Sequence, residues 1–101
     1  MVIAFWLIST PQNKTMYKLK WYKSAKSEYS YWKKYHPSIA TRIDELLNDM
    51  KINPFVGKGK PEPLKYDFAG HWSRRINREN RLIYKVQDKQ IIIVFCRGHY
   101  E

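Results

Sequence analysis

The sequence predicts an α+β domain in which two N-terminal helices pack on one face of a mostly antiparallel sheet of about four or five strands. The chain has 101 residues, which is enough for one packed core and too few for two. Apolar residues recur at helical spacing over residues 24–52, whereas short strand-like segments separated by turn residues fill residues 64–97. One further strand-like segment precedes the helices. We therefore expect the helices to lie together on one side of the sheet.

The first elements are a strand and a helix. Residues 17–22 alternate aromatic or apolar side chains with lysines, the period-two pattern of a half-buried strand. A helix capped by Ser24 is expected next. His36 and Pro37 end it, because proline disfavours helical geometry in the residue before it. The buried positions of this helix are expected to be Ala25, Tyr29 and Trp32.

A second helix is expected from Pro37 to about Ile52, since proline is well placed at a first helical position. One face carries an apolar stripe, formed by Ile39, Ile43, Leu46, Leu47 and Met50. The opposite face is expected to be solvated and carries Arg42, Asp44, Glu45 and Asp49.

The second half of the chain reads as a loop followed by strands. Proline and glycine make Asn53–Pro63 a loop. The expected strands are Leu64–Phe68, His71–Ile76, Arg81–Val86 and Ile91–Arg97. Turn residues separate them at 69–70, 77–80 and 88–89. The aromatic residues expected in the core are Phe68, Trp72 and Tyr84.

The N-terminal stretch has a different character. Val2–Ile8 is apolar but far shorter than the roughly 20 residues that span a bilayer, and no secretory cleavage pattern follows it. We interpret residues 1–15 as an appended or mis-started leader of a domain at 16–101, with an extra strand as the alternative. The single cysteine, Cys96, excludes an intrachain disulfide and is expected to be buried. The chain is therefore expected to be cytoplasmic.

The charge balance indicates a polyanionic partner. The formal net charge is +10, with a sequence pI of about 9.8. Nucleic acid is the commonest partner of so basic a chain, and an anionic membrane or an acidic protein are the alternatives. Lysines, arginines and aromatic residues share the predicted strands, which favours RNA, because cations bind phosphates and rings stack on unpaired bases.

RNA cleavage without a metal sets definite chemical requirements. A base must take the proton of the 2′-hydroxyl, an acid must protonate the departing 5′-oxygen, and cations must stabilise the charge on phosphorus. The candidates for the acid are His36, His71 and His99, and Glu62 is a candidate carboxylate. The residue pattern alone does not choose among them.

Four motifs carry a resemblance to a known family. They are GKGKPEPLK at 57–65, GHWSRRI at 70–76, ENRLIY at 79–84 and CRGHY at 96–100. Together they resemble the YoeB-type toxins of the RelE/ParE superfamily, and the likeness extends over about residues 17–100. The resemblance implies a RelE-like fold and a ribosome-dependent endoribonuclease that needs no metal or other cofactor.

The resemblance also implies a role for particular residues. Glu62 would be the general base, Arg81 would stabilise the charged phosphorane, and His99 would be the general acid. The expected products are a 2′,3′-cyclic phosphate and a 5′-hydroxyl. Residues expected to bind or position the RNA are Tyr100, Lys65, Arg75, Arg74, Lys58 and Lys60. Glu101 follows the terminal His-Tyr pair as a departure from the family pattern, and its carboxylate would favour the protonated form of His99.

The partners implied by the resemblance are mRNA in the A site of the small ribosomal subunit, an acidic antitoxin of the YefM/Phd type, and a second copy in a homodimer.

Two alternatives to the nuclease function remain open. A ParE-like toxin with this fold would inhibit DNA gyrase, but that branch lacks the set Glu62, Arg81 and His99. A non-catalytic protein would only bind, for example as co-repressor with an antitoxin.

Overall fold

The computed structural model describes residues 16–99. Residues 1–15, where a leader or an extra strand was expected, lie outside the described residues, as do Tyr100 and Glu101. Within residues 16–99, two helices and five strands follow one another: β1 (Lys18–Trp21), α3 (Lys23–Tyr35), α4 (Pro37–Ile52), β2 (Glu62–Pro63), β3 (His71–Arg75), β4 (Arg81–Gln87) and β5 (Gln90–Phe95). A short 3-10 helix, Tyr66–Phe68, lies between β2 and β3.

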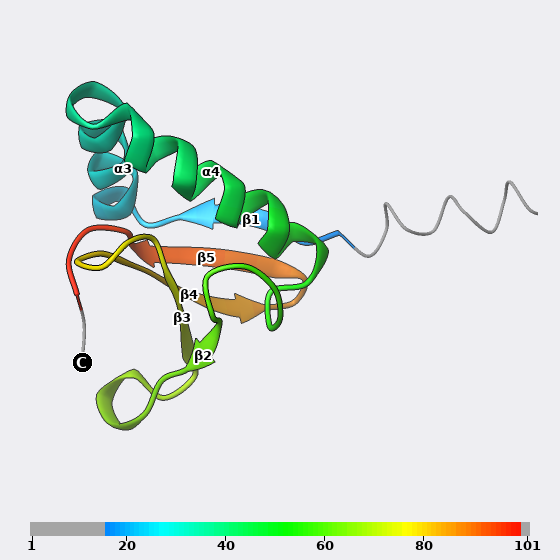
Figure 1. The fold of residues 1–101 in the computed structure, drawn as a ribbon. Helices are drawn as coiled ribbons and strands as arrows, with labels where there is room; N and C mark the ends of the chain where they lie inside the picture. Colours follow the sequence, from blue (N-terminus) through cyan, green and yellow to red (C-terminus); the bar gives the residue numbers. More distant parts are fainter. Residues whose placement is uncertain (1–15, 100–101) are drawn as a thin grey trace, which may run out of the picture.

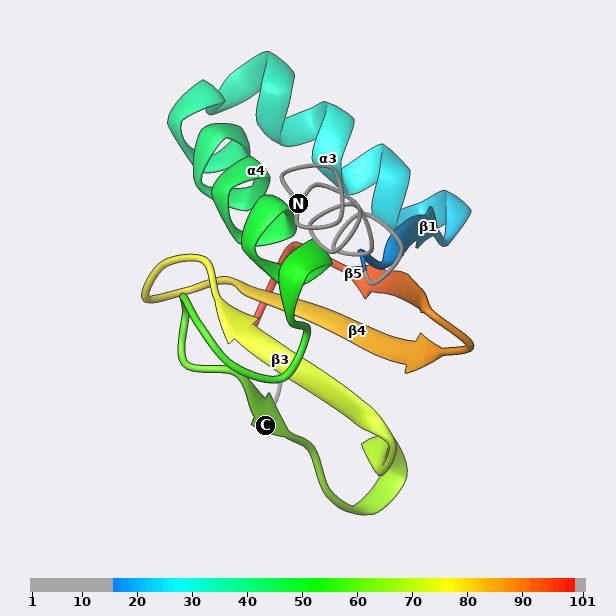
Figure 2. The same cartoon turned by 90° about the vertical axis from the view of Figure 1, so that its right-hand side faces the viewer.

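The strands form one mixed sheet in the order β1-β5-β4-β3-β2. β1 runs parallel to β5, with Lys18 opposite Gln90, and every other pair is antiparallel. Both helices lie on the same face of the sheet (Figures 1 and 2). The predicted α+β architecture is therefore confirmed, with a parallel edge that the sequence pattern did not reveal.

The helices follow the predicted apolar pattern. α4 has Pro37 in its first turn and ends at Ile52, and its stripe is buried except for half-buried Ile39. The cap of α3 was wrongly predicted: the helix begins after Tyr22, and Ser24 lies inside it. The core between helices and sheet is formed by Ala25, Trp32, Ala40, Ile43, Leu46, Leu47, Met50, Ile76, Leu82, Tyr84, Ile91, Ile93 and Cys96. Among residues 16–99, no helix is long and apolar enough to cross a membrane.

The prediction of a strand at Leu64–Phe68 is wrong. Only Glu62–Pro63 pairs with β3, and Tyr66–Phe68 forms a 3-10 turn that begins with Tyr66 at a positive φ of 58°. The three aromatic residues expected in the core are buried to different extents. Tyr84 is fully buried, Trp72 is half-buried against the core, and Phe68 is half-buried outside it.

Strand register determines which side chains share the second face of the sheet. Leu82 and Tyr84 face the helices, so alternation turns the residues between and beside them to the opposite face. Residues opposite each other in an antiparallel pair point to the same side. The helix-free face, defined by this register, carries Glu62, Ser73, Arg75, Arg81 and Lys85.

Candidate active site

Three neighbouring strands bring a carboxylate and two arginines to the helix-free face. Glu62 on β2 lies opposite Ser73, and Arg75 on β3 lies opposite Arg81 at the start of β4. Ser73 and Arg75 are two residues apart and therefore point the same way. Arg75 is thus the diagonal neighbour of Glu62, about 7–8 Å away at the backbone and within reach of long side chains. Glu62 and Arg75 are exposed and Arg81 is half-buried.

Arg81 is anchored to the turn that precedes β4. Its Nη1 donates to the carbonyl oxygens of Asn77 at 2.7 Å, Asn80 at 3.2 Å and Arg78 at 3.3 Å. Within residues 16–99 these bonds use Nη1 alone, so Nε and Nη2 remain for an anion. The guanidinium is therefore fixed at one end and able to bind phosphate at the other.

The same turn holds the C-terminal segment. The backbone N–H of Arg81 donates to the carbonyl oxygen of Gly98 at 2.8 Å, and the Gly98 N–H donates to Oδ1 of Asn80 at 2.8 Å. Asn80, which the sequence did not single out, is buried. His99, the next residue, is exposed. The structure thus brings His99 to the strand that begins with Arg81.

The other two histidines lie away from Arg81: His71 lies on the helix-free face opposite Lys85, at the other end of β3, and His36 lies between the two helices. His71 is half-buried, with its ring centroid 5.4 Å from that of Phe68, and its buried Nδ1 has no hydrogen-bond partner within residues 16–99. His36 is exposed between the helices, 5.5 Å from the ring of Trp32. Neither histidine adjoins Arg81 in the strand register.

The lysines expected to contact RNA surround Glu62. Lys58 and Lys60 are exposed before it, and Lys65 is exposed after it. The loop that bears the first two is fastened to β3, because the Arg75 N–H donates to the Gly59 carbonyl oxygen at 2.7 Å. These side chains are free to meet a polyanion from the solvent side.

Arg74 is the one predicted RNA-binding residue that the structure contradicts. Its side chain is fully buried, and all five guanidinium N–H groups have protein acceptors. Those acceptors are Asp49 Oδ2 at 2.6 Å, the carbonyl oxygens of Asn53 at 2.9 Å, Val56 at 2.9 Å and Lys58 at 3.0 Å, and Tyr84 Oη at 3.3 Å. With no exposed surface and no free donor, Arg74 cannot bind substrate directly.

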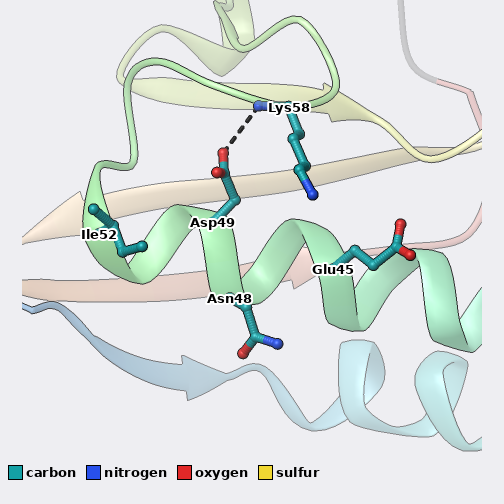
Figure 3. A pocket seen from close by; sticks show the side chains of 5 residues that line it. All are labelled: Glu45, Asn48, Asp49, Ile52 and Lys58. Atoms are coloured by element: carbon teal, nitrogen blue, oxygen red, sulfur yellow. Dashed lines mark hydrogen bonds between the residues drawn. The ribbon is translucent and has the colours of Figure 1, made fainter.

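Asp49 is the partner that the sequence interpretation missed. Expected on a solvated face, its carboxylate instead accepts from Arg74 and from the Lys58 N–H at 2.9 Å (Figure 3). The hydrogen bond from Arg74, followed by that from the Lys58 backbone, holds the pKa of Asp49 below its ordinary value. Strand alternation could have indicated that Arg74 points toward the helices. Trp72, two residues before it, and Ile76, two residues after it, both contact the core on that side.

Two other features lie apart from this site. A hollow of about 300 Å³ beside α4 is lined by Glu45, Asn48, Asp49, Ile52 and Lys58 (Figure 3). Cys96 is fully buried as predicted, and burial, with the nearby Glu28 carboxylate, raises the pKa of its thiol to about 12. In the described part of the chain, no three His, Cys, Asp or Glu side chains are grouped to hold a metal ion.

Solved structures define the class to which this fold belongs. A YoeB/ParE toxin from Agrobacterium tumefaciens superposes with a TM-score of 0.78 at 40% identity, covering 82% of this chain and 99% of that one. The YoeB dimer from Staphylococcus aureus gives a TM-score of 0.78 at 37% identity, covering 84% and 99%. The architecture is therefore that of the RelE/YoeB-like toxins.

Sequence comparison narrows the class to one family. A model described as the YoeB-like toxin of bacterial type II toxin–antitoxin systems matches residues 21–100. Toxin YoeB of Escherichia coli strain K12 is 47% identical over 83 residues, which are 82% of this chain and 99% of that protein. The chain belongs to the YoeB family and is a toxin of the type II toxin–antitoxin class.

Proposed function

We propose that this toxin is a ribosome-dependent endoribonuclease that cleaves mRNA in the A site by metal-independent acid–base catalysis. The observation that carries the proposal is the order of side chains across the helix-free face. Glu62 on β2, Arg75 on β3, Arg81 on β4 and the segment ending in His99 follow one another from strand to strand. Strands lie about 4.8 Å apart, so the two arginines lie between the strand of Glu62 and the segment that ends in His99.

This order suits an in-line displacement at phosphorus. Glu62 takes the proton of the 2′-hydroxyl, and the freed oxygen attacks phosphorus while the bond to the 5′-oxygen breaks. His99 gives its proton to the departing 5′-oxygen. The products are a 2′,3′-cyclic phosphate and a 5′-hydroxyl. Because base and acid act on opposite sides of the phosphorus, the cations belong between them.

The arginines and lysines supply electrostatic stabilisation. Arg81 offers Nε and Nη2 to the phosphate oxygens as negative charge grows, and exposed Arg75 faces the same space. Lys65, Lys58 and Lys60 bind the flanking backbone. We assign Tyr100, which follows His99 outside the described residues, to positioning the nucleotide.

The proposed partners are mRNA, the small ribosomal subunit, an acidic antitoxin of the YefM/Phd type and a second copy of this chain, all in the cytoplasm. The net charge of +10 favours both RNA and an acidic antitoxin segment. Solved relatives from Staphylococcus aureus include a YoeB–YefM complex and a YoeB dimer, which supports the protein partners by analogy.

Cleavage of a defined mRNA in a translation extract, mapped by primer extension, tests the proposal. We expect the wild type to cut within codons only when ribosomes are present. Glu62→Gln, Arg81→Ala and His99→Gln should each lower the cleavage rate by about 10²–10⁴. His36→Gln, at an exposed histidine outside the site, is the matched control and should cut at the wild-type rate.

An intact message with folded wild-type protein would overturn the proposal. A supercoiling assay with DNA gyrase would then test the ParE-like activity, and an antitoxin–operator binding assay would test a purely binding role. Full cleavage by all three site variants would show that the chemistry resides elsewhere.

A further inference from the structure

The buried Arg74 guanidinium lies beneath the loop that leads from α4 to Glu62. Three of its five acceptors are backbone carbonyl oxygens of this α4–β2 loop (residues 53–61). Carbonyl groups in an irregular loop have no strand or helix partners, and a buried one left without a donor is costly. A single planar side chain therefore satisfies three backbone carbonyl groups spread along the loop.

Asp49 fastens the same loop from the side of α4. Its Oδ2 accepts from Arg74 Nη1 at 2.6 Å and from the Lys58 N–H at 2.9 Å. The fit is close: a Cβ on Gly57 would lie 2.0 Å from that oxygen, and a Cβ on Gly59 would lie 3.0 Å from the Arg75 carbonyl oxygen. These two glycines therefore allow the loop to pack closely against α4 and β3.

The strand that carries Glu62 is too short to fix that residue by itself. β2 has two residues, and its pairing with β3 is continued by one bond on either side: the Arg75 N–H donates to the Gly59 carbonyl oxygen of the loop at 2.7 Å, and the Leu64 N–H donates to the His71 carbonyl oxygen at 2.8 Å. Two-residue pairings are marginal on their own. The chain reaches Glu62 directly from the α4–β2 loop, through Lys60 and the stiff residue Pro61.

We propose that Arg74, held by Asp49, is a positioning residue that sets the location of the Glu62 carboxylate from inside the protein. This inference rests on the proposed nuclease function and assigns Arg74 a part in it without contact with RNA. Its guanidinium acts through the loop backbone. Lysine in its place keeps the charge but offers three donors without the planar fork, so it cannot satisfy the same five acceptors.

A double-mutant cycle distinguishes positioning from a general contribution to folding. Single-turnover cleavage of ribosome-bound mRNA is measured for the wild type, Arg74→Lys, Glu62→Gln and the double variant. If Arg74 acts through Glu62, Arg74→Lys lowers the rate about 10²-fold with half-saturation unchanged, because a misplacement of about 1 Å has that effect. In the Glu62→Gln background the same substitution should lower the rate less than about threefold.

Arg42→Lys is the matched control. Arg42 also bonds β3-side carbonyl oxygens, those of Ile76 at 3.3 Å and Arg75 at 3.5 Å, but none in the α4–β2 loop. It should cleave at close to the wild-type rate in both backgrounds. If circular dichroism shows Arg74→Lys unfolded, Asp49→Asn replaces it in the cycle, since it leaves Arg74 in place and removes only the carboxylate charge.

The outcomes separate the two proposals. Equal rate losses in both backgrounds would mean that Arg74 only maintains the folded fraction, and would overturn the positioning role while leaving the nuclease intact. A wild type that leaves the mRNA whole would overturn the nuclease function and the positioning role with it. Glu62→Gln at the wild-type rate would overturn the positioning role and the role of Glu62 as base, while leaving the nuclease function intact.

Discussion

The two ends of the candidate site are attached to the sheet in different ways. The segment before Glu62 is seated on a fully buried guanidinium with five protein acceptors. The segment before His99 is held by two bonds at Gly98 and by exposed Arg97, whose guanidinium lies 3.8 Å from the centroid of the Tyr31 ring. The base is therefore positioned through one buried side chain, whereas the two residues before the acid are held by hydrogen bonds, one of them to buried Asn80, and by one contact at the surface. Disturbing the first should lower stability and activity together, whereas disturbing the second should lower activity with only a small loss of stability.

Alanine at two glycines gives the largest contrast between these ends. Gly57 and Gly98 both have positive φ, of 125° and 107°. An added Cβ at Gly57 would push the Asp49 carboxylate off Arg74, whereas at Gly98 nothing lies within 4 Å. Gly57→Ala should lower the free energy of unfolding by about 3 kcal/mol and Gly98→Ala by about 1 kcal/mol, the backbone strain alone. Urea unfolding measures both, and equal losses would remove the contrast.

The ion pair between Asp49 and Arg74 predicts a pH dependence. An unfolded aspartate binds a proton near pH 4, while the lowered pKa keeps folded Asp49 ionised to lower pH. The pair therefore stabilises the fold above about pH 4, and this contribution is lost as pH falls through the folded pKa. Asp49→Asn should lower stability by about 2 kcal/mol at pH 7, since the carboxylate is 27% exposed.

The measurement is the free energy of unfolding from pH 7 down to pH 2 for the wild type and Asp49→Asn. The difference between the two proteins should shrink below pH 4. A difference that stays constant with pH would show that the charge of Asp49 contributes nothing. The control variant is Glu45→Gln, at an exposed residue of α4.

Arg97→Gln tests the surface contact that holds the segment before His99, the proposed acid. A cation–π contact at an exposed site contributes about 0.5–1 kcal/mol, so stability should change by less than 1 kcal/mol. The mRNA cleavage rate should fall severalfold, because the residues directly before His99 lose the contact that Arg97 makes with Tyr31 of α3. Lys34→Gln removes a comparable contact, 5.3 Å from the Tyr35 ring, and should leave the rate unchanged. Equal rates for the two variants would contradict the role given to Arg97.

The smallest effect concerns the exposed lysines of the α4–β2 loop. Lys58→Gln and Lys60→Gln should leave stability and the rate at saturation unchanged. Each should reduce the salt dependence of binding to a short RNA by about one unit of slope, the value for one phosphate contact. A loss of cleavage at saturation would place these side chains in the chemistry instead.

Elements defined by local periodicity were predictable. The apolar stripe of α4 fixes which of its side chains are buried, and the structure agrees with it. In β4, Leu82, Ile83 and Tyr84 are all buried, which departs from strict alternation at the register shift between Ile83 and Tyr84. The partner of β1 was not predictable, because alternation at 17–22 records burial and is the same for a parallel or an antiparallel neighbour. The segment 64–68 misled because it has strand-like residues, yet Tyr66 adopts a positive φ that breaks pairing.

The candidate site was predictable only as far as residue identity allows. Glu62, Arg81 and His99 were assigned through the family motifs, and their roles remain proposals. Arg74 was grouped with Arg75 because the two are adjacent and equally charged. Successive residues of a strand point to opposite faces, so Arg74 is buried and Arg75 is exposed. Which of the two is buried depends on partners in other elements, Asp49 and Tyr84.

The parallel pairing of β1 with β5 has a consequence for biosynthesis. β5 lies between β1 and β4, so the first strand has no neighbour until one of the last segments of the chain has been made. The helices meanwhile lack the sheet that buries their apolar sides, and contacts this distant in sequence form slowly. A nascent or prematurely terminated chain that lacks β5 cannot join β1 to the rest of the sheet, so this toxin should complete its fold only late in its own translation.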